Sequence, residues 1–204
     1  MSESDSRIPL WRQLQATADV LVAIRRGASG TTALEAVQAG LRPGVQALAY
    51  QVLRSLGRAE AVRRLLAPRK PPAAVDALLC TALALIWDET AAPYEGFTLV
   101  NQAVEAAKHT AAIRAQAGFV NGCLRRFLRE RHDLVARTET DPVARWNHPS
   151  WWIERLRRDH PQAWQAILQA NNRQAPMTLR VNVQKATVDA YLLRLREAGI
   201  EAWR

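Results

Sequence analysis

Between residues 9 and 130 the apolar side chains recur at intervals of three and four residues, which is the spacing of one face of an α-helix. Glycine and proline interrupt this pattern at residues 27–30, Gly40, Gly57, residues 68–72 and Pro93. We therefore predict seven helices with short connections, packed as one all-helical domain. Thr32 and Glu35 have the spacing of a capping box, so we expect Thr32 to cap the second helix.

Residues 73–87 are apolar on most sides of their predicted helix, so we expect this helix at the centre of the domain. The most apolar part, residues 77–87, is about half of the roughly 20 residues that a bilayer span needs. Residues 1–7 lack the basic segment and apolar run of a signal peptide. We therefore expect a cytoplasmic protein without a membrane segment.

Cys80 and Cys123 lie in apolar helical stretches, without CxxC spacing or neighbouring histidines. We predict two reduced, buried cysteines and no metal site, with a single disulfide as the alternative. A nucleophilic role is not expected, because a reactive thiol needs an accessible and electropositive setting.

Charge points to a partner: 28 Lys and Arg against 19 Asp and Glu give a formal net charge of +9, and the pI is about 10.7. The basic residues are 25 arginines and 3 lysines. Arginine pairs with phosphate through two parallel hydrogen bonds and stacks on bases, which makes nucleic acid a candidate partner. GC-rich coding produces the same arginine bias, and both explanations stay open at this stage.

The sequence changes character after residue 137. Residues 138–142 look like a linker, and a stretch rich in tryptophan follows over short helices. Residues 177–183 alternate apolar and polar, which predicts a strand. Thr187 is expected to cap the helix that follows, and residues 199–204 are expected to begin another extended segment. We assign a helical domain to 1–137, a Trp-rich helical linker to 138–172 and the incomplete beginning of a small α/β domain to 173–204.

Arginines cluster at the end of the last helix of the first domain. Arg125, Arg126 and Arg129 are spaced to share a face, with Arg131 just beyond, and could bridge successive phosphates. A solvated face near a helix C-terminus is the alternative. Arg145 accompanies a possible stacking platform for an unpaired base, formed by Trp146, Trp151 and Trp152, whose alternative is burial between domains. The candidate RNA-binding residues are Arg125, Arg126, Arg129, Arg131, Arg145, Arg173 and Arg180.

Three stretches together resemble one family. They are residues 99–108 (LVNQAVEAAK), residues 118–129 (GFVNGCLRRFLR), and residues 148–156 (HPSWWIERL) with 170–182 (ANNRQAPMTLRVN). They resemble the bacterial 16S ribosomal RNA cytosine-C5 methyltransferases B, whose front end is similar to the transcription antitermination factor NusB. The third stretch resembles the segment that joins the NusB-like part to the catalytic part.

The resemblance implies a mainly α fold: a NusB-like all-helical RNA-binding domain followed by the start of a ferredoxin-like or RRM-like α/β segment. It implies ribosomal RNA and a catalytic domain in the same polypeptide as partners, and S-adenosylmethionine as the cofactor of the full-length family member. Members carry a Rossmann-like cofactor domain and two cysteines. One cysteine attacks C6 of the target cytosine, and the other assists product release. No Gly-rich turn after a strand and no Pro-Cys motif occurs in this sequence.

We therefore expect no catalytic, cofactor-binding or metal-binding residue in this chain, and no activity from it alone. The first alternative is a stand-alone NusB-like antitermination factor that binds RNA. The second is a helical protein-interaction module whose charge reflects only its coding sequence.

Overall fold

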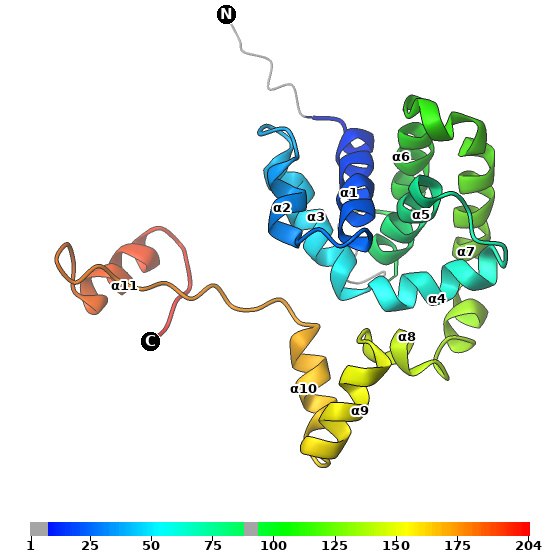
Figure 1. The fold of residues 1–204 in the computed structure, drawn as a ribbon. Helices are drawn as coiled ribbons and strands as arrows, with labels where there is room; N and C mark the ends of the chain where they lie inside the picture. The colour runs from blue at the N-terminus through cyan, green and yellow to red at the C-terminus, as the bar shows by residue number, and fades with distance from the viewer. Residues whose placement is uncertain (1–7, 88–93) are drawn as a thin grey trace, which may run out of the picture. The chain divides into compact units, whose positions relative to one another are not determined.

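The computed structural model describes residues 8–87 and 94–204, and the chain divides into two compact units, the first ending at Arg173 and the second running from Gln174 to Arg204. The first unit holds the helices α1 to α10 (Figure 1). Up to residue 137 these are α1 (Leu10–Arg25), α2 (Gly30–Glu35), α3 (Arg42–Arg54), α4 (Leu56–Leu66), α5 (Ala73–Leu85), α6 (Gly96–His109) and α7 (Ala117–Ala136), with a 3-10 helix over Ala111–Gln116. In the part that the structure describes, the seven predicted helices are confirmed.

Helix α5 forms the centre of this bundle. Every residue from Val75 to Leu85 is buried, and α5 contacts α1, α3, α4, α6 and α7. A helix with apolar side chains all round can bury them only when neighbours cover every face, which is the arrangement found here. The one charged side chain buried on α5, Asp76, forms ion pairs with Arg63 at 2.7 Å and Arg25 at 3.0 Å.

The cap of α2 differs from the prediction. Ser29 has an extended backbone (φ −66°, ψ 152°), and its side chain accepts a hydrogen bond from the Thr32 backbone N–H at 3.0 Å. The predicted capping box at Thr32 is wrong, because Thr32 already lies inside the helix. Ser29 and Thr32 both carry a hydroxyl that can accept a hydrogen bond from a backbone N–H. The residue with the extended backbone, Ser29, serves as the cap.

The start of α6 lies close against α7. A Cβ atom added to Gly96 would meet the Leu128 side chain at 3.0 Å, so a residue without a side chain allows this approach. Helix α7 is bent at Glu130, whose backbone (φ −109°, ψ 18°) is not helical. The edge where α6 begins and α7 bends is the region in which the predicted arginines lie.

Three further helices, α8 (Pro142–Trp146), α9 (Ser150–Asp159) and α10 (Trp164–Asn171), carry a small apolar cluster of their own. Asn147 fastens them to the bundle. Its Oδ1 accepts a hydrogen bond from the Gly57 N–H at 2.7 Å, and its Nδ2 donates to the Leu53 carbonyl and to the Asn172 Oδ1, both at 3.0 Å. Asn147 also has a left-handed backbone (φ 57°), which asparagine tolerates better than other residues with a side chain.

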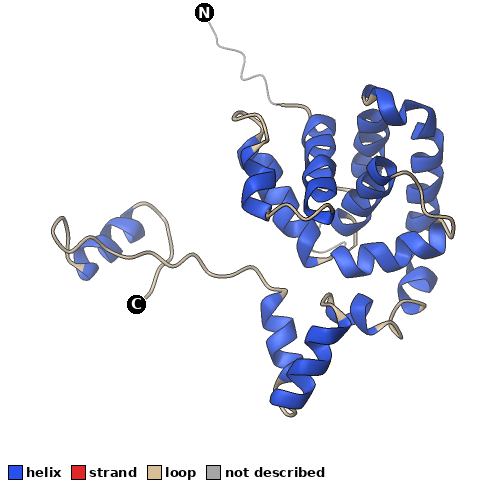
Figure 2. Cartoon of the chain, in the orientation of Figure 1, coloured by secondary structure: helices blue, strands red, loops and turns tan. Residues whose placement is uncertain are grey.

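The second unit contains α11 (Val188–Glu197), in which no residue is buried. The predicted cap is confirmed: the Thr187 hydroxyl accepts a hydrogen bond from the Ala190 N–H at 3.2 Å. Residues 177–183 form no strand, and in the described ranges the chain shows helices and loops only (Figure 2). The alternating pattern is present, but a strand is defined by hydrogen bonds to a neighbouring strand, and this unit supplies none.

Within residues 8–87 and 94–204, no helix combines the length and the apolar character needed to cross a membrane.

Candidate nucleic-acid interface

The four arginines of the predicted cluster all lie in the middle of α7, between residues 125 and 131, but their surroundings differ. Arg125 and Arg129, one helical turn apart, are exposed to solvent. The Arg126 Nε forms an ion pair with the Glu130 Oε2 at 2.8 Å, and the Arg129 Nη2 lies 3.7 Å from the Glu130 Oε1. Glu130 therefore offsets part of the positive charge, and Arg125 with Arg129 presents most of the remainder to solvent.

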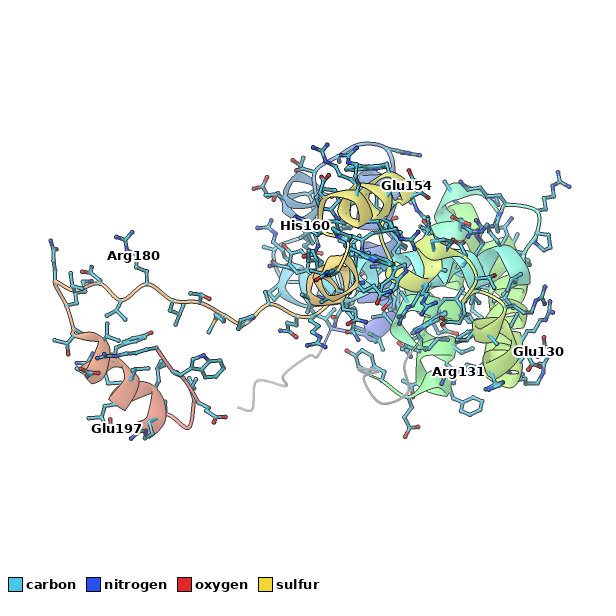
Figure 3. All side chains as sticks on the ribbon, turned by 90° about the horizontal axis from the view of Figure 1, so that it is seen from below. Glu130, Arg131, Glu154, His160, Arg180 and Glu197 are labelled. Carbon is cyan, nitrogen blue, oxygen red and sulfur yellow. The ribbon has the colours of Figure 1, made fainter. Side chains whose placement is uncertain are left out.

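Arg131 contacts the fold rather than the arginine face. Its Nη2 donates a hydrogen bond to the carbonyl oxygen of Ile86, and its Cζ lies 5.3 Å from the centre of the Phe127 ring. Figure 3 shows Glu130 at the outer edge of the helical unit and Arg131 on the inner side of α7. Arg131 follows the buried Phe127 by four residues, so it lies on the face of α7 that packs against the bundle. Its hydrogen bond joins α7 to the end of α5.

Two adjoining cavities lie beside this edge. One, of about 420 Å³, is lined among the described residues by Ile86, Tyr94, Glu95, Gly96, Phe97, Leu128 and Arg131. The other, of about 340 Å³, is lined by Phe97, Arg125, Leu128 and Arg129. Phe97 and Leu128 border both cavities, and we refer to the two together as the groove at the α6–α7 edge. Arginines of α7 line both of its parts, and Tyr94 and Phe97 contribute aromatic rings.

Phe97 is 69% exposed, and Tyr94 is 36% exposed. An exposed phenyl ring beside two exposed guanidinium groups is the combination that binds unpaired nucleotides, since the ring stacks on a base and the cations pair with phosphate. Sequence reasoning did not single out Tyr94 or Phe97. The available signal was that Phe97 lies outside the apolar stripe of its helix, which consists of Leu99, Val100, Ala103, Ala106 and Ala107.

The predicted tryptophan platform is largely covered. Trp146 is buried and lies edge to face against Trp164, with ring centres 4.9 Å apart. Trp152 is half-buried, and Trp151 is 63% exposed. Arg145 is exposed, with its Cζ 5.3 Å from the centre of the Trp146 ring. Of the three indoles, Trp151 alone presents most of its surface to solvent.

The two remaining candidates belong to different units. Arg173 is the last residue of the first unit, and Arg180 lies in the extended segment of the second. Both are exposed, and Figure 3 shows the Arg180 side chain extending from its segment. Within the first unit the structure thus brings together Arg125, Arg126 and Arg129 on α7, and Arg145 and Arg173 belong to other segments of that unit.

Both cysteines are free and buried, as predicted. Burial raises the pKa of the Cys80 thiol to about 11, and it also raises the pKa of Cys123. Neither thiol is thus set up as a nucleophile near neutral pH. Among the described residues, no three His, Cys, Asp or Glu side chains are grouped closely enough to hold a metal ion.

Two family models match this chain, one after the other. The model described as the NusB family matches residues 13–129, and the model described as the RsmF/B-like methyltransferase ferredoxin-like domain matches residues 148–204. The first covers more than half of the chain and coincides with the helical bundle. The second begins at α9 and includes the whole second unit.

Three similar proteins bear the same name. Ribosomal RNA small subunit methyltransferase B of Vibrio cholerae is 32% identical over 178 residues, covering 85% of this chain and 41% of the Vibrio protein. The protein of the same name from Pasteurella multocida is 34% identical over 164 residues, covering 78% of this chain and 35% of that protein. The one from Shigella sonnei is 43% identical over 86 residues, 42% of this chain and 20% of that protein. The chain thus spans about two fifths or less of these curated relatives.

Proposed function

The chain belongs to the NusB family, and from this premise we propose that it is the RNA-binding and RNA-positioning part of a methyltransferase that modifies a cytosine of 16S ribosomal RNA at C5. The observation that carries the proposal is the order of the two matches along the chain, NusB helices first and a methyltransferase-type ferredoxin-like region second. A stand-alone antitermination factor of the NusB kind would leave residues 148–204 without a role.

In this proposal the side chains of the groove at the α6–α7 edge bind different parts of the RNA. Exposed Arg125 and Arg129 supply the phosphate contacts, and Phe97 between the two cavities supplies a surface for a base. Methyl transfer and the S-adenosylmethionine that it uses are assigned to the catalytic part of a longer protein of the relatives' length. On this proposal the protein works in the cytoplasm, where bacterial ribosomes assemble.

The test is a titration of fluorescently labelled fragments of 16S ribosomal RNA with the chain at several salt concentrations. The variant Arg125→Glu with Arg129→Glu reverses two charges at the groove. We expect at least a tenfold loss of affinity, and a plot of log affinity against log salt that is flatter by about 1.4 to 1.8, because each lost phosphate contact removes about 0.7 to 0.9 from the slope.

The matched control is Arg69→Glu with Lys70→Glu, which makes the same change of charge on the exposed loop after α4. A control variant that loses as much affinity as the groove variant would show that only total charge matters. Affinity that vanishes between low and moderate salt, with no preference among RNAs, would overturn the proposal in favour of a protein-interaction module with a basic surface.

A further inference from the structure

We propose that the groove at the α6–α7 edge holds one unpaired nucleotide of the RNA, whose base stacks on Phe97 and is read by the Glu95 carboxylate, with guanine preferred. The inference rests on the proposed function and narrows its substrate to a single-stranded segment. The proposed site consists of described residues that line the two cavities.

The groove has room for such a ligand. Its two cavities, of about 420 and 340 Å³, share Phe97 and Leu128 as a common border. Each falls in the range of roughly 300 to 1,000 Å³ that is typical of small-ligand sites. Gly96 lies in the wall of the larger cavity, and a Cβ there would press on the Leu128 side chain at 3.0 Å. A side chain at this position would therefore disturb the wall against which a base would lie.

Phe97 is the stacking surface. Its side chain is 69% exposed, whereas the core phenylalanine of the adjacent helix, Phe127, is fully buried. An exposed phenyl ring gains nothing from the fold, and a base placed on it removes apolar surface from water. Every base has a π-face, so stacking by itself binds without selecting a sequence.

The charges around Phe97 separate the places of base and backbone. Arg125 and Arg129 of α7 line the smaller cavity. The larger cavity is lined by Glu95, which precedes α6, and by Arg131 of α7, whose guanidinium contacts the Ile86 carbonyl and the Phe127 ring. The arginines of both cavities thus come from α7, and the carboxylate comes from the start of α6. Phosphate is attracted to the arginines and repelled by the carboxylate. The backbone therefore runs along the α7 side, and the base lies on the Glu95 side.

Glu95 has a side chain available for reading a base. It occupies the N-cap position of α6, yet its side chain makes no hydrogen bond to the helix, and it is exposed at the cavity. An ionised carboxylate only accepts hydrogen bonds, so it selects a base edge that carries donors. Guanine has two adjacent donors, N1–H and the N2 amino group, which match the two carboxylate oxygens. Adenine and cytosine each set one amino group beside an acceptor, and uracil sets one imino hydrogen between two carbonyls.

The experiment measures binding of the full chain to labelled nine-residue RNAs: nine uridines, and the same strand with one central guanosine, adenosine or cytidine. A duplex of equal length serves as the double-stranded comparison. We expect the guanosine strand to bind most tightly, the uridine strand at least fivefold more weakly, and the duplex more weakly still.

Two variants test the two contacts separately. Phe97→Ala should lower affinity for all four strands about tenfold with an unchanged salt slope, and Phe97→Trp should restore it, because stacking contributes about 1 to 3 kcal/mol per base. Glu95→Gln should remove the preference for guanosine while leaving binding of the uridine strand unchanged or slightly stronger. Matched controls are Tyr50→Ala, an aromatic ring 46% exposed on α3, and Glu35→Gln on α2, both expected to bind as the parent chain does.

The inference is overturned if Phe97→Ala binds within twofold of the parent, if the duplex binds as tightly as the single strands, or if Glu95→Gln keeps the guanosine preference. Any of these results together with a strong effect of Arg125→Glu and Arg129→Glu would leave the proposed RNA-binding function in place. Loss of the arginine effect as well would remove both.

Discussion

The Asn147 side chain joins α8 to α10 to the bundle, beside the packing of α8 on α4 and the Arg64–Asp141 ion pair. Its amide makes hydrogen bonds to the Gly57 N–H, to the Leu53 carbonyl and to the Asn172 side chain, at 2.7, 3.0 and 3.0 Å. Gly57 and Leu53 flank the corner between α3 and α4, and both groups lie at helix ends, where the helices themselves supply no partner. We predict that Asn147→Ala detaches α8 to α10 from the bundle at low denaturant.

The magnitude follows from these contacts. Three hydrogen bonds are lost at a net cost of about 1 kcal/mol each at partly buried positions. An alanine in the left-handed backbone of residue 147 costs about 1 kcal/mol more. Allowing for water that replaces some of the lost partners, we expect a decrease of about 3 kcal/mol in the free energy of unfolding.

Urea unfolding followed by tryptophan fluorescence measures this change, since Trp146 and Trp164 lie in the attached segment. Asn147→Gly is the matched variant: it loses the same three hydrogen bonds but accepts the left-handed backbone, so it should lose about 1 kcal/mol less than alanine. A change within about 0.5 kcal/mol of the parent for Asn147→Ala would refute the reasoning about the attachment. Glycine as costly as alanine would refute the backbone part of it.

Three further predictions concern the packing of the bundle. Gly57→Ala places a Cβ 2.6 Å from the Val143 carbonyl oxygen, so we expect a loss of about 2 kcal/mol in the same fluorescence transition. Asp76→Ala leaves the buried Arg63 without its carboxylate partner, whereas Arg25 keeps Glu60, and we expect a loss of about 3 kcal/mol by urea unfolding monitored by circular dichroism. Cys80 ionises more readily in the unfolded chain, with an ordinary pKa of 9.0, than in the folded one, at about 11. The stability that comes from keeping this buried thiol neutral is therefore fully present below pH 9 and is lost as the pH rises to 11. Over that interval the free energy of unfolding should fall by about 2 to 3 kcal/mol more in the parent than in Cys80→Ala.

The arginine cluster illustrates how far a sequence pattern carries. The spacing of Arg125 and Arg129 was sufficient to place both on one exposed face of a helix. The same spacing places Arg131 on the buried face, because it follows the buried Phe127 by four residues. It does not identify the Ile86 carbonyl as the group to which Arg131 donates. Periodicity assigns a side chain to a face of a helix, but it does not identify the distant residue that the side chain contacts.

The groove itself could not have been predicted from local patterns. Phe97 and Arg129 are more than thirty residues apart, and they meet only because the start of α6 packs against α7 through Gly96. Asn147 is a similar case, since nothing around it in the sequence indicates hydrogen bonds to residues about ninety positions earlier. Contacts of this kind depend on which helices become neighbours.

Interactions between near neighbours in the chain therefore explain the helices of this protein and the side-chain caps at Ser29 and Thr187. The local sequence also explains why α5 is buried, since its residues are apolar on most sides. Packing between distant segments decided which arginines stayed in solvent and which aromatic ring was left exposed beside them. The alternating residues 177–183 belong to the same class, because a strand forms only where another strand satisfies its backbone hydrogen bonds. Helix hydrogen bonds close within four residues, whereas grooves and sheets require partners that the chain brings together only on folding.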